Sequence, residues 1–229
     1  MADVRCASII KNFENPRVEV LKSISFDIGR GDFVAVTGKS GSGKSTLLYI
    51  LSGLDTPTAG RVIIDGKNIF DLPEAEMNHF RNTRMGFVFQ FHYLLPELTS
   101  LDNVLMPARK LKREKEVRER ALELLRRFDL EHCVGKHPAQ MSGGEQQRVA
   151  VARSLIMGPD ILFADEPTGN LDSVNGERIM NMLREINDKS GTTVILVTHE
   201  PDYAAIAGRQ IHLTDGRIDR DKKKTVKGY

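Results

Sequence analysis

The 229-residue chain has few cysteines, little net charge and no long apolar run, and each shortage argues against a class of protein. Its two cysteines, Cys6 and Cys133, are far apart and lack CxxC spacing, which argues against a disulfide framework and favours a reducing compartment. The 33 basic and 31 acidic residues are too balanced for a broad basic face, so no nucleic-acid partner is expected. Because the six histidines are scattered, no structural metal site is expected either.

Membrane-spanning and secretory segments are also missing. No stretch approaches the roughly 18 apolar residues that a spanning helix needs, and the N-terminus lacks a basic segment followed by an apolar one. We therefore expect a cytosolic chain unless another protein anchors it. The one basic cluster is the tail, which we expect to be solvated and frayed, with binding to anionic lipid headgroups as the alternative. Its lysines are Lys222, Lys223, Lys224 and Lys227.

What the chain does contain is a regular alternation of strand and helix patterns. Its hydrophobic content is 40% and its charged content 28%, as in ordinary globular proteins. In residues 114–130, apolar side chains recur every three or four positions, which predicts an amphipathic helix. Short apolar runs that predict strands lie at 32–38, 86–90, 160–165, 192–199 and 209–213. Apolar strands alternating with helices predict an α/β fold with a mostly parallel sheet flanked by helices.

The first 70 residues differ from the rest. Short β patterns occur in the first thirty residues and at 61–66 without intervening helices, which predicts an antiparallel β subdomain. We expect one domain over residues 1–229. Within it we expect the antiparallel β subdomain and a phosphate-binding loop in 1–70, a mainly helical inserted subdomain in 71–158, and the remaining core and the tail in 159–229.

A glycine-rich loop follows the apolar run at 32–38. Gly38, Gly43, Lys44 and Ser45 fit the pattern G-x-x-x-x-G-K-[ST] of the P-loop, between a predicted strand and a predicted helix. The glycines let successive N–H groups turn toward phosphate oxygens at a helix N-terminus, Lys44 would reach the β- and γ-phosphates, and the Ser45 hydroxyl would bind Mg²⁺. The predicted nucleotide-binding residues are Gly38, Lys39, Ser40, Gly41, Ser42, Gly43, Lys44, Ser45 and Thr46.

Two carboxylates follow the apolar run at 160–165. The strand in ILFADEP would place Asp165 at the carboxyl edge of the sheet, where it would hold Mg²⁺, and Glu166 would polarise the attacking water. The alternative is a solvated acidic pair on a loop. MSGGEQQ, which begins at Met141, predicts a second phosphate-binding helix start, with an ordinary capped helix as its alternative.

These motifs, in this order, resemble the ATP-binding cassette (ABC) family over nearly the whole chain. Gln90 in FVFQ is similar to the Q-loop, MSGGE to the LSGGQ signature and GNLD, which ends at Asp172, to the D-loop. His199 in LVTHE resembles the switch histidine, and Phe13 resembles the A-loop aromatic that stacks on adenine. Taken alone, Phe13 is as readily a core residue as a nucleotide-binding one. A single histidine such as His199 more often has a structural role than a catalytic one.

The departures from the family pattern are small. Met141 and Glu145 replace the usual Leu and Gln of the signature, and Lys39 is an uncommon residue inside the P-loop. Lys39 is expected to be solvated, with a phosphate or partner contact as the alternative. No departure removes a catalytic group.

The resemblance implies the ABC ATPase fold, ATP and Mg²⁺ as ligands, and a head-to-tail dimer. In such a dimer, the P-loop of one chain and Ser142, Gly143 and Gly144 of the other enclose each ATP. Glu166 would be the general base, and His199 would hold the γ-phosphate and the water. Gln90 would touch Mg²⁺ and sense a partner, with Ser45 and Asp165 as the other Mg²⁺ ligands, and Asp172 would couple the two sites.

Within the family, FADEPTGNLD and FHYLLPELTSLDNVLMP resemble the lipoprotein-releasing and macrolide-exporter group, which implies membrane partners and a place on the cytoplasmic face of the inner membrane. We expect lipoprotein release first, then another export or mechanical signalling role, then a cell-division complex. The apolar segment at residues 90–106 either receives a membrane subunit or packs into its own lobe. Alternatives of other classes are a soluble ABC ATPase acting on DNA or ribosomes, and a nucleotide-regulated binding module without turnover.

Overall fold

The computed structural model describes residues 2–224, which form two compact units. The first unit contains the chain up to Arg81 and from Arg184 onward, and the second unit contains Asn82–Leu183. Helices α2 (Glu74–Arg84) and α6 (Ser173–Ser190) each contain a boundary between the two units.

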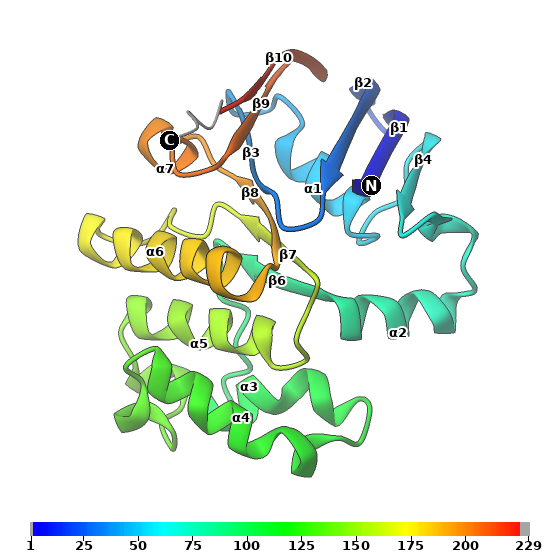
Figure 1. The fold of residues 1–229 in the computed structure, drawn as a ribbon. Coiled ribbons are helices and arrows are strands. Elements are labelled where there is room, and N and C mark those ends of the chain that lie inside the picture. Colours follow the sequence, from blue (N-terminus) through cyan, green and yellow to red (C-terminus); the bar gives the residue numbers. More distant parts are fainter. Residues whose placement is uncertain (1, 225–229) are drawn as a thin grey trace, which may run out of the picture. The chain divides into compact units, whose positions relative to one another are not determined.

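An antiparallel sheet begins the first unit. Its strands, β1 (Ala2–Glu14), β2 (Arg17–Gly29), β4 (Ala59–Ile64) and β5 (Lys67–Asn68), lie in the order β2-β1-β4-β5 (Figure 1). Along β2, Ile24, Phe26 and Ile28 alternate with exposed residues and are buried, and Leu21, three positions before Ile24, is buried as well. A short 3-10 helix, Ile69–Asp71, follows β5. The antiparallel pairing predicted for this region is confirmed.

The first unit also carries parallel strands. β3 (Phe33–Gly38) pairs in parallel with β8 (Thr193–Val197) and with β9 (Arg209–Thr214). Helix α1 (Lys44–Leu51) packs against β3 and β8 and also against β2, through the buried residues Leu47, Leu48, Ile50 and Leu51. The short helix α7 (Pro201–Ala204) packs against β3. The predicted strand–loop–helix junction around the P-loop is therefore present.

The predicted frayed tail is wrong for Lys222 and Lys223. These residues belong to β10 (Arg217–Lys223), which pairs in an antiparallel manner with β9. Arg209, which is only 7% exposed, holds β10 in place. Its Nε donates to Asp221 Oδ1 over 2.7 Å. Lys224 donates to the carbonyl of Ala205, and Lys227 lies outside the described residues.

The second unit combines two parallel strands with a group of helices. β6 (Met85–Phe89) pairs with β7 (Ile161–Asp165), whose five residues are all buried. Figure 1 shows α3 (Ser100–Arg109), α4 (Glu114–Arg127) and α5 (Gly143–Leu155) packed together. Two short 3-10 helices, Glu131–Cys133 and Pro138–Gln140, lead from α4 to α5.

Helix α4 is shorter than the predicted 114–130 because a left-handed residue ends it. Asp129 has a φ of 58°, and the N–H of Leu130 then donates to the carbonyl of Leu125 over 2.8 Å. Phe128 stays buried although it lies past the last helical residue. Within residues 2–224, no helix has the length and apolar character needed to cross a membrane.

Candidate nucleotide site

The P-loop has a backbone that requires glycine at its first position. Gly38 ends β3 with a φ of 144°, and a Cβ there would stand 2.3 Å from the carbonyl oxygen of Leu213. Gly43, directly before α1, has a φ of 99°, and its Cβ would lie 2.8 Å from the Leu21 side chain. Larger residues would force the loop away from β9 and β2.

The side chains of the loop are held by the loop itself. Lys44 is 8% exposed, and its Nζ donates to the carbonyls of Gly38 over 3.0 Å and of Lys39 over 3.1 Å. Ser42 is 5% exposed, and its buried Oγ finds no hydrogen-bond partner within residues 2–224. The first N–H groups of α1 have no partner within the helix. The loop thus gathers a buried ammonium, a buried hydroxyl and helix N–H groups in one turn.

Two further predicted residues lie in the first unit. Phe13 is 44% exposed, and the Lys11 ammonium stands 4.9 Å from the centre of its ring. The alternative that Phe13 packs in a core is therefore wrong. His199 is exposed just after β8, where the N–H of Glu200 donates to the Thr198 hydroxyl and shapes the turn.

The remaining predicted residues lie in the second unit. Asp165 ends β7 and is 7% exposed, while Glu166 follows with a φ of 45°, the left-handed region that side chains rarely adopt. The carbonyl of Glu166 accepts from the N–H of Gly169 over 3.1 Å, which closes the turn. Backbone strain of this kind gathers at functional sites.

Gln90 lies beside this turn. Its backbone carbonyl accepts from Asn170 Nδ2 over 3.2 Å, and its amide nitrogen is 3.4 Å from Asn170 Oδ1. A Cβ on Gly169 would lie 2.9 Å from the same amide nitrogen, so a larger residue at this position would displace Gln90. The structure therefore brings the Q-loop glutamine and the turn after Glu166 together.

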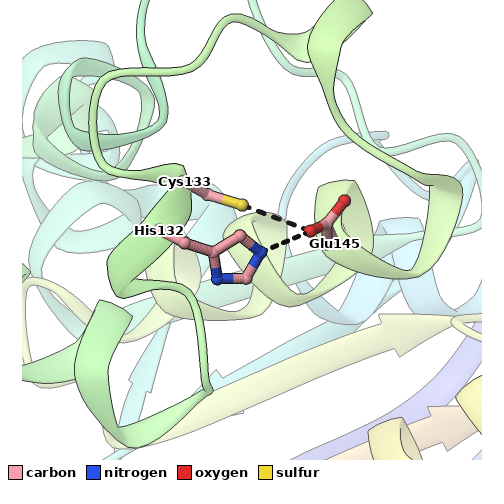
Figure 2. Close-up of side chains that lie close together, drawn as sticks. All are labelled: His132, Cys133 and Glu145. Carbon is pink, nitrogen blue, oxygen red and sulfur yellow. Dashed lines mark hydrogen bonds and ion pairs between the residues drawn. The ribbon is translucent and has the colours of Figure 1, made fainter.

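The signature residues form the capped start of α5. Ser142 Oγ accepts from the N–H of Glu145 over 3.3 Å, while Glu145 Oε2 accepts from the N–H and the hydroxyl of Ser142 over 2.7 and 2.9 Å. The other oxygen, Oε1, faces His132 and Cys133 (Figure 2). These bonds, first the one from the Ser142 backbone and then the one from His132, lower the pKa of Glu145 to about 2.

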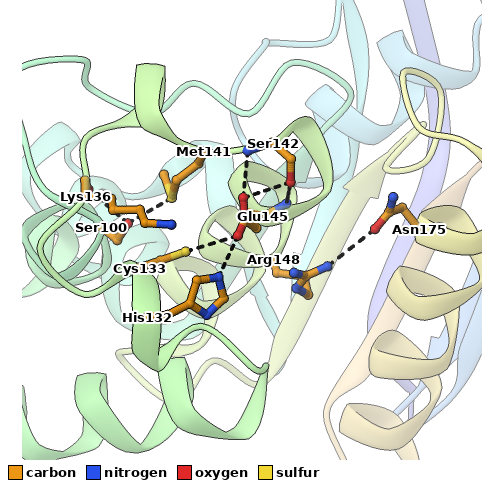
Figure 3. Close-up of polar contacts among 9 residues, drawn as sticks. All are labelled: Ser100, His132, Cys133, Lys136, Met141, Ser142, Glu145, Arg148 and Asn175. Atoms are coloured by element: carbon orange, nitrogen blue, oxygen red, sulfur yellow. Dashed lines mark hydrogen bonds and ion pairs between the residues drawn. The ribbon is translucent and has the colours of Figure 1, made fainter.

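The signature and the D-loop also meet. The Asn175 amide oxygen is 3.4 Å from an Arg148 nitrogen (Figure 3), and a Cβ on Gly144 would stand 2.4 Å from the same oxygen. Asn175 donates its N–H and its side-chain amide to the two carboxylate oxygens of Asp172, each over 2.8 Å. These hydrogen bonds lower the pKa of Asp172, which is therefore ionised at neutral pH.

Gln147 is a site residue that the sequence analysis missed. Its side chain is fully buried, and its Nε2 donates to the carbonyl of Phe89 over 3.0 Å and to that of Pro167 over 2.6 Å. Phe89 precedes Gln90, and Pro167 follows Glu166. One amide therefore joins the signature helix to both segments. A glutamine on the apolar face of α5 was the available signal.

Residues 91–99 form an irregular loop that two side chains hold in place. Asn103, fully buried in α3, donates to the carbonyls of Leu95, Leu98 and Thr99 and accepts from the N–H of Leu95, all within 3.1 Å. Arg153 donates to the carbonyls of His92 and Tyr93. The loop backbone is fixed, yet three of its apolar side chains stay exposed: Phe91 by 61%, Tyr93 by 63% and Leu95 by 39%.

Comparison with known proteins agrees with this geometry. A model of the ABC transporter family matches residues 21–169, which include the P-loop, the signature and the strand that ends at Asp165. The chain belongs to the ABC transporter family. It is the ATP-binding ATPase cassette of that family, and its α/β fold is that of the solved cassettes.

Two similar curated proteins carry the same name. The chain is 52% identical over 222 residues to the lipoprotein-releasing system ATP-binding protein LolD of Leptospira interrogans serogroup Icterohaemorrhagiae serovar Lai (strain 56601), covering 95% of this chain and 93% of that protein. It is 50% identical over 201 residues to the lipoprotein-releasing system ATP-binding protein LolD of Aquifex aeolicus (strain VF5), covering 87% of this chain and 89% of that protein.

A similar solved structure is the dimeric post-hydrolysis state of the ATP-binding cassette MJ0796 bound to ADP and Pi. Its TM-score is 0.88 at 41% identity, with 99% of this chain and 100% of that chain covered.

The predicted site residues thus fall into two groups. Phe13, the P-loop and His199 belong to the first unit, whereas Gln90, Asp165, Glu166, the signature and Asp172 belong to the second. Within the second unit, Gln147 and Asn175 connect these residues directly. Lys39, Ser40 and Gly41 are exposed in the loop, and Ser45 and Thr46 lie in the first turn of α1.

Proposed function

We propose that this chain is the ATP-hydrolysing subunit of a membrane complex that releases lipoproteins. Two observations support it: the cassette motifs occur in order along the chain, and two proteins that are 50–52% identical over most of it are named for that system. The family match concerns this chain itself, whereas the lipoprotein substrate is inferred from the similarity to those relatives.

The residues present fit a nucleotide. The P-loop offers helix N–H groups, the Ser42 hydroxyl that lacks a partner among the described residues, and the Lys44 ammonium, which now rests on loop carbonyls. Each is a donor that phosphate oxygens satisfy. Lys39, Ser40, Gly41, Gly43 and Thr46 would complete the cradle, and the half-exposed ring of Phe13 would stack on the adenine.

Hydrolysis would use the residues that the motifs predict for catalysis. Bound Mg²⁺ would supply charge neutralisation at the β- and γ-phosphates, with Ser45, Gln90 and Asp165 as its ligands. Glu166 would take the proton from the attacking water, and His199 would hold the water and the γ-phosphate in position. Two conformational features support the role of Glu166: it follows a fully buried strand, and it has a strained backbone.

A second copy of the chain completes each site in this proposal. Ser142, Gly143 and Gly144 would contact the ATP held by the partner copy, since a capped helix start with two glycines presents free N–H groups to an anion. Asp172 would couple the two sites, because Asn175 links it to the signature helix. The dimeric state of the similar cassette MJ0796 supports this arrangement.

The experiment that tests the enzyme assignment is Glu166→Gln. The change keeps size but removes the proton acceptor, so turnover should fall about 10²- to 10⁴-fold while ATP binding is retained. A closed dimer should accumulate with ATP and be visible by size-exclusion chromatography. Glu177→Gln, at an exposed position on α6, is the matched control. Turnover of Glu166→Gln at the control rate would contradict the assignment.

The membrane subunit is proposed to dock at residues 90–106, which would place the chain on the cytoplasmic face of the inner membrane. Phe91, Tyr93, Leu95 and Met106 are exposed there by 39% or more. Their loop needs no partner for its own order, because Asn103 and Arg153 already hold its backbone. The loop also begins beside Gln90, so docking would connect the ATP site to the membrane subunit.

Tyr93→Asp tests this docking. Since Tyr93 is 63% exposed, the variant should fold and hydrolyse ATP, yet fail to assemble with the membrane subunits in a detergent pull-down. Leu98→Asp, at a half-buried position, would test the deeper part of the loop. Val174→Asp, at an apolar position that is 62% exposed on α6, is the control and should assemble normally. A Tyr93→Asp variant that assembles like the control would refute the docking site.

A further inference from the structure

A cluster of three metal-ligating side chains lies behind the signature. Among the described residues, one group of His, Cys, Asp or Glu side chains gathers closely enough to hold a metal ion: His132, Cys133 and Glu145. Their ligand atoms all lie within 4.8 Å of one another, and Figure 2 shows all three side chains converging on one point. The cluster is separate from the residues assigned to ATP.

We propose that His132, Cys133 and Glu145 bind a thiophilic divalent cation such as Zn²⁺. Imidazole nitrogen, thiolate sulfur and carboxylate oxygen are the three donor types of protein zinc sites, and three protein ligands leave a fourth position for water. This proposal goes beyond ATP hydrolysis and does not depend on it.

Binding requires the three side chains to rearrange by about 1 Å. Glu145 Oε1 is 2.7 Å from His132 Nε2 and 3.4 Å from Cys133 Sγ. Around a tetrahedral Zn²⁺ with bonds of about 2.0–2.3 Å, neighbouring ligand atoms stand roughly 3.3–3.8 Å apart. The sulfur already satisfies this spacing to Glu145 Oε1, whereas the sulfur and the imidazole nitrogen, which are up to 4.8 Å apart, must approach by up to about 1.3 Å. The imidazole must withdraw by somewhat more than half an ångström, which its exposed side chain allows.

Protonation follows from the contacts. Because Glu145 is a carboxylate and can only accept, its hydrogen bond with His132 requires a proton on Nε2. On binding, that proton moves to Nδ1 through the neutral tautomer, and the Cys133 proton leaves to solvent as the sulfur–metal bond forms. Because the Cys133 thiol donates to Glu145 Oε1, it carries a proton before binding, and binding should release that proton.

The charges around the cluster are compatible with a bound divalent ion. Lys136 and Arg148 are near enough to lower the pKa of Cys133, and Figure 3 shows both beside the cluster. One thiolate and one carboxylate neutralise the ion, so these two cations face a neutral complex and not an additional positive charge.

Glu145 would keep its role in the signature when the metal is bound. Its Oε2 accepts from Ser142 and faces away from the cluster, while Oε1 alone would bind the ion. The metal would therefore tie the 3-10 helix Glu131–Cys133 to the first turn of α5. It would hold the signature turn more rigidly without removing the capping box.

The test is Zn²⁺ binding to the nucleotide-free, full-length protein under reducing conditions. We expect one Zn²⁺ per chain in competition with a chromophoric chelator, release of a proton, and a higher thermal midpoint. Co²⁺ should give a sulfur-to-metal charge-transfer band. Cys133→Ser should abolish the band and weaken binding by about tenfold or more, and His132→Gln should weaken binding similarly.

Three further variants make the result specific. Glu145→Gln removes the charged oxygen while keeping side-chain length and should also weaken binding by about tenfold or more. Cys6→Ser, at the other buried thiol, and His137→Gln, at an exposed histidine in the same unit, should bind Zn²⁺ as the unmodified chain does. If Cys133→Ser fails to fold, the exposed position of His132 keeps the test available. Absence of stoichiometric binding, or binding unchanged by His132→Gln and Glu145→Gln, would overturn the proposal.

Discussion

Gln147→Met replaces the fully buried amide that joins α5 to two other segments with an unbranched apolar side chain of similar length. The carbonyls of Phe89 and Pro167 then lose the hydrogen bonds from Gln147. Losing the buried bond to Pro167 costs about 1–3 kcal/mol and losing the part-buried bond to Phe89 costs about 0.5–1.5 kcal/mol, so the two together cost about 1.5–4.5 kcal/mol. Removal of Gln147 Oε1, which has no hydrogen-bond partner within residues 2–224, offsets about 1–2 kcal/mol of this cost. The free energy of unfolding should therefore fall by up to about 3.5 kcal/mol.

Turnover should fall as well, because the two carbonyls lie next to proposed site residues. Phe89 precedes Gln90, and Pro167 follows Glu166. A misplacement of about 1 Å at a reacting group costs on the order of 10²-fold in rate. We expect kcat to fall about 10- to 100-fold with little change in nucleotide affinity, because neither carbonyl belongs to the P-loop.

The measurements are urea unfolding, nucleotide affinity and steady-state ATPase activity on Gln147→Met and on Gln146→Met. Gln146 lies at the neighbouring position of α5 and donates to the carbonyls of Pro138 and Met141, away from both proposed catalytic segments. An unfolding free energy and a kcat equal to those of Gln146→Met would refute the reasoning. Lower stability with an unchanged kcat would show that Gln147 supports the fold alone.

Two further substitutions test the first unit. Gly38→Ala should lower the free energy of unfolding by about 1–3 kcal/mol and weaken ATP binding, because its Cβ would meet the Leu213 carbonyl. Differential scanning calorimetry and nucleotide titration measure both effects. The control is Gly66→Ala, where no atom lies within 4 Å of the added Cβ. Phe13→Ala should weaken ATP binding about 5- to 150-fold through the loss of about 1–3 kcal/mol of stacking. Val18→Ala, at the cross-strand neighbour of Phe13, should leave the affinity for ATP unchanged. Equal nucleotide affinities in the two variants would show that the adenine stacks elsewhere.

The features that sequence alone predicted are local ones. The P-loop needs glycine at Gly38 and Gly43 for reasons that arise within a few residues, and its strand and helix are adjacent in the chain. The predicted start of α5 is local in the same sense, because the capping box found there joins Ser142 and Glu145, three positions apart. Such patterns can be recognised in a sequence because the residues that cause them lie within a few positions of one another.

The features that sequence did not predict depend on distant partners. Gln147 binds carbonyls 58 and 20 positions away, and no periodic pattern announces either contact. Lys222 and Lys223 were expected to fray as part of the basic tail, but pairing of β10 with β9 and the bond between Arg209 and Asp221 order them. The convergence of His132 and Cys133 on Glu145 was hidden in the same way, since the scattered histidines gave no ligand spacing.

Gln147 also bears on how two ATP sites communicate in the proposed dimer. There, the signature at Ser142 would serve the partner's ATP, whereas Glu166 of the same chain would serve its own. Gln147 sits between them, in the signature helix and bonded to the turn after Glu166, so it lies on a direct path from one site to the other. Coupling between binding sites is reciprocal, so loosening this link should weaken the effect of each ATP on the other. Gln147→Met should therefore lower the Hill coefficient for ATP toward one, whereas Phe13→Ala, which weakens each site without touching the link, should shift the affinity and leave the cooperativity in place.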